Sequence, residues 1–113
     1  MFLEGIDTRI VNVYAPSDAR QRIVFVKKLR VKKYLKKGDI VLGDFNCVPD
    51  TALDVRYSDE SGKTGADYPN RGGRETEALL SDIGLVDAFR EHRGHARAYS
   101  HRTSTVYTRI DRV

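Results

Sequence analysis

The sequence has few of the residues that cross-link secreted domains or anchor proteins in membranes. It holds a single cysteine, Cys47, so no disulfide can form within the chain, which is typical of proteins from a reducing compartment. No histidine is adjacent to Cys47 in the sequence, and a buried thiol is therefore expected rather than a nucleophile. No apolar stretch approaches the length of a membrane-spanning helix, and the N-terminus has no signal-peptide pattern. We expect an intracellular protein with no membrane partner.

Length and charge limit the classes of protein that remain. The 113 residues suffice for one small domain, and no internal repeat or low-complexity tract is present. Lysine and arginine together number 20 against 16 acidic residues, a formal net charge of +4. This excess fits either an ordinary exposed surface or a polyanionic partner such as nucleic acid.

The most informative stretch is a short apolar run followed by two oxygen-bearing side chains. Residues 40–42 (Ile-Val-Leu) lie between two glycines, a pattern typical of a buried strand. Asp44 and Asn46 follow where this strand would end, and residues two apart in a strand point the same way. Their side chains suit a hard cation, a water proton or a phosphate. The alternative is that both are ordinary turn residues.

The residues before this stretch predict a strand and then a helix. Residues 8–14 are rich in β-branched side chains, and Pro16 ends the strand, leaving Tyr14 at its end. Ser17 is a suitable N-cap for a helix that continues to about Lys37 and stops at Gly38. The second half of the helix is strongly basic, which favours a solvated face over a nucleic-acid contact. If the flanking strands are parallel, this helix is a right-handed crossover.

The second half of the chain predicts a loop, a helix and two strands. The expected elements are a polar loop over 54–74, a helix over 75–83, and strands over 98–101 and 106–110. Asp111 ends the last strand, and on its own it reads as a carboxylate balanced by Arg109 or Arg112. His92 and His95 have no third metal ligand near them in the sequence, and exposed loop histidines are expected.

Four segments, in this order and spacing, resemble a known superfamily. They are Asn12-Val13-Tyr14-Ala15-Pro16-Ser17, Gly43-Asp44-Phe45-Asn46, Gly84-Leu85-Val86-Asp87-Ala88-Phe89-Arg90 and Arg109-Ile110-Asp111-Arg112. Together they resemble the endonuclease/exonuclease/phosphatase superfamily, and most of all the apurinic/apyrimidinic-type endonuclease domain encoded by non-LTR retrotransposons. The resemblance extends over most of the chain.

The resemblance implies an α/β fold, a four-layered sandwich of two packed mixed sheets flanked by helices. It implies that residues 1–113 form part of that domain. The family's early Asn motif and its metal-binding Glu would lie upstream of Met1, and its Ser-Asp-His motif beyond Val113. Such a part would expose the sheet face that the missing strands should cover.

The resemblance also implies a chemistry, the metal-dependent hydrolysis of a phosphodiester in DNA. With Mg²⁺ or Mn²⁺ in the complete domain, Asp44 would orient or deprotonate water and Asn46 would hold a phosphate oxygen. Tyr14 would stabilise the phosphate or leaving group, and Asp111 would orient the family's histidine. A retrotransposon origin would place the protein in the nucleus. Without the metal-binding Glu and the histidine, we expect the isolated chain to be a very poor or inactive nuclease.

Two other interpretations remain open from the sequence. The chain can be a non-catalytic remnant that binds nucleic acid weakly through its basic helix. Within the enzymes, the family also includes phosphatases of inositol phosphates or lipids, although the Tyr-Ala-Pro and Arg-Ile-Asp-Arg strings favour the nuclease branch.

Overall fold

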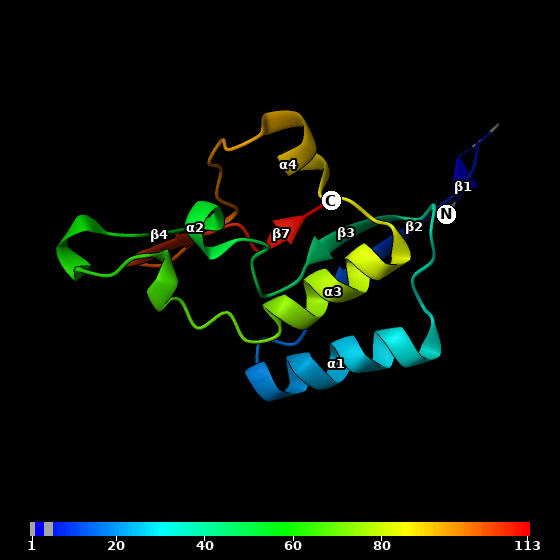
Figure 1. The fold of residues 1–113 in the computed structure, drawn as a ribbon, viewed down its shortest axis with the longest axis horizontal. Helices are drawn as coiled ribbons and strands as arrows, with labels where there is room; N and C mark the ends of the chain where they lie inside the picture. The colour runs from blue at the N-terminus through cyan, green and yellow to red at the C-terminus, as the bar shows by residue number, and fades with distance from the viewer. Residues whose placement is uncertain (1, 4–5) are drawn as a thin grey trace.

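The computed structural model describes residues 2, 3 and 6–113, and it confirms the predicted α/β class (Figure 1). The strands are β1 (Phe2–Leu3), β2 (Ile6–Tyr14), β3 (Ile40–Asp44), β4 (Val55–Tyr57), β5 (His101–Arg102), β6 (Val106–Thr108) and β7 (Asp111–Arg112). The helices are α1 (Ala19–Lys32), α2 (Thr51–Asp54), α3 (Gly73–Ile83) and α4 (Ala88–Arg93), with short 3-10 turns η1 (Asp59–Ser61) and η2 (Gly65–Asp67). None of the helices in the described part of the chain is long and apolar enough to cross a membrane.

The strands form two small sheets. The first is mixed, in the order β1-β2-β3-β7, and the second is antiparallel, in the order β4-β6-β5. Strands β2 and β3 are parallel, and α1 is the crossover that joins them. Two sheets accompanied by helices are consistent with part of an α/β sandwich.

Helices α1 and α3 cover one face of the first sheet. Val13 of β2 and Val41 of β3 are buried in one cluster with Val26 of α1 and Leu79 of α3 (Figure 1). Because side chains alternate along a strand, the neighbours of these valines point to the opposite face. Tyr14, on that face, is 76% exposed.

Helix α1 begins one residue later than the sequence predicted. Its N-cap is Asp18 rather than Ser17, and the Asp18 carboxylate accepts a hydrogen bond from the Gln21 N–H at 3.0 Å. Both residue types cap helices well, and only the backbone geometry selects between them.

The predicted end of this helix at Lys37 is wrong. Helix α1 ends at Lys32, and Lys33 adopts a left-handed conformation with φ 54°. The turn places Leu35 in the core, where it is buried with the cluster of α1 and α3. Burial of one leucine, worth about 1.5–3 kcal/mol, outweighs the helix propensity of the lysines that follow.

The polar stretch over 54–74 is more ordered than a loop. It contains β4 and both 3-10 turns, and its first residue, Asp54, is fully buried. The helix predicted over 75–83 is confirmed as α3, which begins two residues earlier and ends at Ile83, followed by Gly84 as its C-cap with φ 85°.

The C-terminal strands differ from the prediction in one respect that matters for the site. The strand expected over 106–110 is present in shorter form as β6, whereas the strand expected over 98–101 is largely wrong, because β5 shares only His101 with it. Asp111 does not end β6, however. It begins β7, which leaves the second sheet and pairs antiparallel with β3 in the first. Asp111 therefore joins Asp44 in one sheet, which sequence periodicity cannot reveal.

Candidate active site

Three of the four candidate residues lie in one row across the first sheet. The register pairs Tyr14 of β2 with Asp44 of β3, and Asp44 with Asp111 of β7. Residues in register on adjacent strands point to the same face. The row lies on the face opposite α1 and α3, with Tyr14 and Asp111 exposed and Asp44 half-buried. Side chains that are up to 97 positions apart in the sequence (111 − 14) are thereby neighbours.

The two carboxylates occupy a close position of the β3–β7 ladder. The Phe45 N–H donates to the Ile110 carbonyl at 2.9 Å, which marks a hydrogen-bonded pair. Such pairs alternate with non-hydrogen-bonded pairs, where facing Cα atoms lie about 4.5 Å apart. Asp44 and Asp111 form the non-hydrogen-bonded pair, in agreement with the Asp111 N–H, which points away from β3 and donates to Oγ of Ser100 at 3.0 Å.

Asn46 lies just beyond β3 and is fixed to the ends of both parallel strands. Its φ of 51° is left-handed, so the strand geometry assumed for Asp44 and Asn46 does not extend this far. The Asn46 N–H donates to Oδ1 of Asp44 at 2.8 Å, and its Nδ2 donates to the Ala15 carbonyl at 2.6 Å. The first bond is the turn expected of Asp and Asn after a strand. The same bonds hold the Asp44 and Asn46 side chains in fixed positions beside the row.

Among the described residues no arginine forms an ion pair with Asp111, so its expected balance by Arg109 or Arg112 is wrong. Arg109 and Arg112 are both buried and point elsewhere. Arg109 pairs with Asp54 and Asp87, and Arg112 pairs with Glu77. Within the described ranges neither Asp44 nor Asp111 takes part in an ion pair. Two facing carboxylates without a cation destabilise a sheet, so their arrangement has a cost in stability that a bound cation would relieve.

The donor set of this row fits a hard divalent cation that keeps most of its water. Mg²⁺ is usually held by one or two carboxylates, with water and substrate oxygens completing the shell. Asp44 and Asp111 would hold such an ion. The described residues contain no group of three or more His, Cys, Asp or Glu side chains that could hold a metal ion, at this row or elsewhere.

Sequence reasoning did not connect α4 with the site. His92 and Arg93 of α4 line a surface hollow together with Asp111. No histidine of the described residues is hydrogen-bonded to Asp111. The bond that is present joins the backbone N–H of Asp111 to Oγ of Ser100. No local signal in the sequence predicts this placement, because it depends on how α4 packs against β7.

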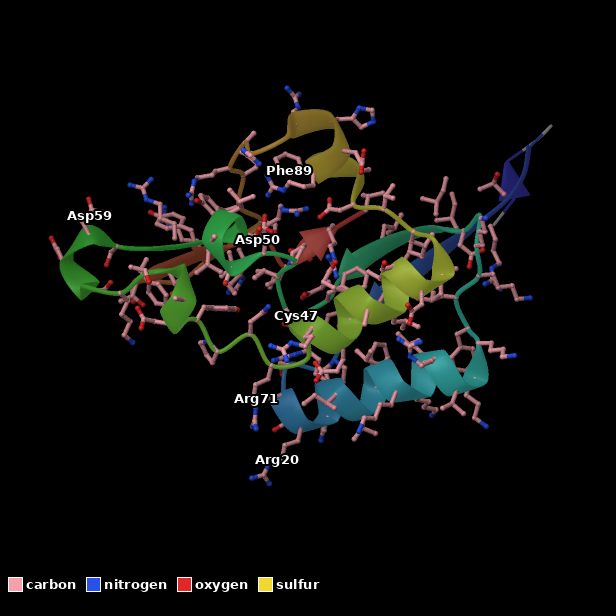
Figure 2. The ribbon with its side chains drawn as sticks, viewed as in Figure 1. Arg20, Cys47, Asp50, Asp59, Arg71 and Phe89 are labelled. Atoms are coloured by element: carbon pink, nitrogen blue, oxygen red, sulfur yellow. The ribbon has the colours of Figure 1, made fainter. Side chains whose placement is uncertain are left out.

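Two further side chains with reactive or charged groups lie apart from the row. The Cys47 thiol is buried and donates to Oγ1 of Thr76 at 3.6 Å, and burial raises its pKa above the ordinary value. It is therefore an unreactive core residue, as expected. Arg71 is exposed, and Figure 2 shows it with Arg20 pointing outward beside the beginning of α1.

Comparison with known proteins gives no relative from which a role can be transferred. No protein-family model matches the chain, and no curated protein matches it. The motifs and the geometry of the row are therefore the observations that bear on function.

Proposed function

We propose that this chain carries part of a metal-dependent phosphodiesterase site, of the DNA endonuclease class. The observation that supports the proposal best is the facing pair Asp44–Asp111, which lies beside Tyr14. Neither carboxylate forms an ion pair with a basic side chain of the described residues. The motifs around these residues resemble one nuclease superfamily, and the geometry joins the same residues in space.

Each side chain of the site has a role that its contacts allow. Asp44 keeps Oδ2 free to orient a water or accept its proton, because the Asn46 N–H occupies Oδ1. Asn46 has one amide N–H committed to Ala15 and a second for a phosphate oxygen. Tyr14 presents an exposed phenol to the phosphate or the leaving group. A bound Mg²⁺ would supply positive charge for the developing anion, which is the main requirement of phosphoryl transfer.

The activity of the isolated chain is expected to be very low. In the family's chemistry Asp111 would orient an imidazole, whereas here it faces Asp44 as a cation ligand, and no histidine of the described residues is hydrogen-bonded to it. Loss of one group that stabilises a transition state lowers a rate by about 10²–10³-fold. A site without a general acid therefore gives little turnover.

A plasmid-nicking assay with Mg²⁺ tests the proposal, with Asp44→Ala as the site variant and Asp82→Ala as the control. Asp82 is an exposed carboxylate on α3, away from the row. We expect barely detectable nicking by the wild-type chain and the control, and none by Asp44→Ala. Strong nicking that Asp44→Ala abolishes would support the site and contradict the expected low activity. Strong nicking that Asp44→Ala leaves unchanged would place the chemistry elsewhere and overturn the proposal.

A non-catalytic role in nucleic-acid binding is favoured by the surface of α1. Its lysines are exposed, and none of the ion pairs formed by the described residues includes a lysine. This role predicts weak DNA binding whose affinity falls steeply as the salt concentration rises. The double variant Lys27→Glu plus Lys28→Glu should also lower the affinity, and Asp44→Ala should leave it unchanged. Fluorescence anisotropy with a labelled duplex separates the two functions.

A further inference from the structure

The second sheet carries two arginines and a tyrosine side by side on one face. The register pairs Arg56 of β4 with Tyr107 of β6, and Tyr107 with Arg102 of β5. Residues in register on adjacent strands point to the same face, so these three side chains form an arginine–tyrosine row. The next residues along the strands, Val55 and Thr108, are buried, whereas both arginines of the row are exposed. The row therefore lies on the outer face of the sheet.

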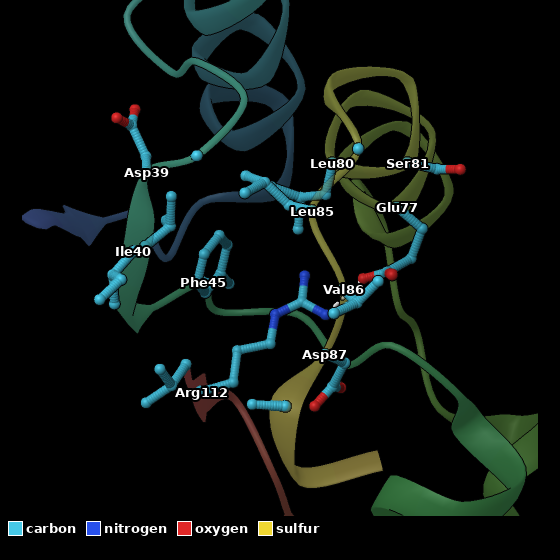
Figure 3. A pocket seen from close by; sticks show the side chains of 15 residues that line it. Asp39, Ile40, Phe45, Glu77, Leu80, Ser81, Leu85, Val86, Asp87 and Arg112 are labelled. Carbon is cyan, nitrogen blue, oxygen red and sulfur yellow. Dashed lines mark hydrogen bonds and ion pairs between the residues drawn. The ribbon is translucent and has the colours of Figure 1, made fainter. Parts of the chain in front are cut away.

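The two arginines of this row have no acidic partner. The ion pairs of the described residues include neither Arg56 nor Arg102. Arg112 of β7, by contrast, is buried and pairs with Glu77, beside which Figure 3 shows its guanidinium. An arginine side chain stays charged at any ordinary pH. The row thus presents two positive charges that no carboxylate of the described residues balances.

The chain around β5 adds positive charge and no negative charge. Between Glu91 and Asp111 it holds four arginines and all three histidines, and no acidic residue. Arg93 and Arg97 of this segment are exposed like the arginines of the row. Charges of one sign gathered on a surface attract a polyanion, and nucleic acid is the polyanion that arginine binds through its phosphates.

The tyrosine of the row offers a ring on which a base can stack. The guanidinium carbon of Arg102 lies 5.8 Å from the centre of the Tyr107 ring, and the Tyr99 ring centre lies 5.8 Å from it as well. Unpaired bases stack on aromatic rings and on guanidinium planes, whereas the bases of a duplex are already stacked on one another. Arginines combined with a ring therefore favour a single strand over a duplex.

We propose that the arginine–tyrosine row binds single-stranded DNA, with a base stacked against Tyr107 and Arg102 and neighbouring phosphates paired with Arg56 and Arg102. Adjacent strands lie about 4.8 Å apart, so the two arginines are separated by about 10 Å across the sheet. Tyr107 precedes Asp111 by four residues, which limits the distance between them to about 14 Å. The proposal rests on the proposed function, because it names the form of DNA that reaches the candidate site.

The first test measures binding of a fluorescently labelled oligothymidylate of about 12 nucleotides by anisotropy, in a buffer with EDTA. The variant is Arg56→Gln plus Arg102→Gln. The control is Arg20→Gln plus Arg71→Gln, two exposed arginines beside the beginning of α1 (Figure 2). We expect the variant to bind at least about tenfold more weakly and the control to bind like the wild type. Each phosphate contact with a single strand contributes about 0.7 to the slope of log affinity against log salt, so the slope should flatten by about 1.4 in the variant.

The second test detects stacking directly. The chain has no tryptophan, so Tyr107→Trp introduces a single fluorophore into the row. We expect the oligothymidylate to quench its fluorescence, and an abasic strand of the same length to bind at least about fivefold more weakly. The control Tyr34→Trp, at an exposed tyrosine after α1, should show no quenching.

Equal affinity of wild type and arginine variant, absence of quenching in Tyr107→Trp, or equal affinity for the abasic strand would overturn the proposal. Tighter binding of a duplex of the same length would overturn it as well. Because no metal is present in these measurements, they do not depend on a cation at Asp44 and Asp111. Failure of this proposal is therefore observed separately from failure of the nicking assay.

Discussion

At the scale of single residues, the carboxylate of Asp54 is held by three hydrogen bonds. Its Oδ1 accepts from Nε of Arg109 and Nη2 of Arg90, both at 2.7 Å, and its Oδ2 accepts from the Asp50 N–H at 3.1 Å. The carboxylate is fully buried, so its charge depends on these partners. This network holds the chain just before Asp111. In the sequence, Asp54 is one polar residue of a polar stretch, and nothing local predicts its burial.

Replacement of Asp54 should therefore be costly. We expect Asp54→Asn to lower the free energy of unfolding by about 3 kcal/mol, because it leaves two arginines without their shared carboxylate. Urea denaturation followed by circular dichroism measures the change. Asp82→Asn breaks the exposed ion pair with Arg30 and should cost less than about 1 kcal/mol. Equal stability of the two variants would contradict a stabilising role for the buried network.

Asp87 should make stability depend on pH. Burial acts to raise its pKa, but hydrogen bonds from Arg109 and from the Arg90 N–H outweigh burial, and its pKa lies below the ordinary value. A lowered carboxylate pKa stabilises the fold fully above the ordinary pKa of aspartate, about 4. This contribution is lost as the pH falls through the lowered pKa.

The variant Asp87→Asn isolates that charge, because asparagine still caps α4. Denaturant titrations of the wild-type chain and the variant at several pH values measure the effect. The wild type should be the more stable at neutral pH, and the difference should shrink as the pH falls below about 4. A difference that stays constant from neutral to acid pH would show that the Asp87 charge does not contribute.

At the scale of elements, local patterns were sufficient where local chemistry decides. Strands β2 and β3 follow from their β-branched and apolar residues, and α3 from its apolar side and Gly84. The end of α1 and the start of β7 were not predictable in this way. The first depends on burial of Leu35, and the second on pairing with a strand far away in the sequence.

Gly43 fixes how closely β2 and β3 approach at the site. Its φ is 137°, and a Cβ atom there would lie 1.9 Å from the carbonyl oxygen of Val13. We expect Gly43→Ala to destabilise the chain by about 3 kcal/mol, since the backbone of β2 would have to move. In the control Gly62→Ala, φ is 70° and no atom lies within 4 Å, so about 1 kcal/mol is expected. Thermal unfolding of both variants tests this, and similar costs would mean that the contact with Val13 is relaxed in solution.

At the scale of the whole molecule, the candidate site forms where one sheet gathers distant parts of the chain. The sequence indicated Asp44 and Asn46 through the apolar strand that precedes them, and Tyr14 and Asp111 only through the motifs around them. It did not supply the register that aligns three of them, because strand pairing across 67 positions (111 − 44) has no local signature. It also did not reveal the burial of Arg112 and its ion pair with Glu77, which arise from packing.

A Mn²⁺ titration of the nitrogen-15-labelled chain, followed by paramagnetic broadening of its amide signals, shows directly whether the facing carboxylates bind a cation. If Asp44 and Asp111 form a cation site, broadening at low Mn²⁺ should centre on these two residues and Ser100, and should disappear there in Asp44→Asn but persist in Asp82→Asn. Broadening no stronger at this pair than at exposed carboxylates such as Asp59 would contradict the account.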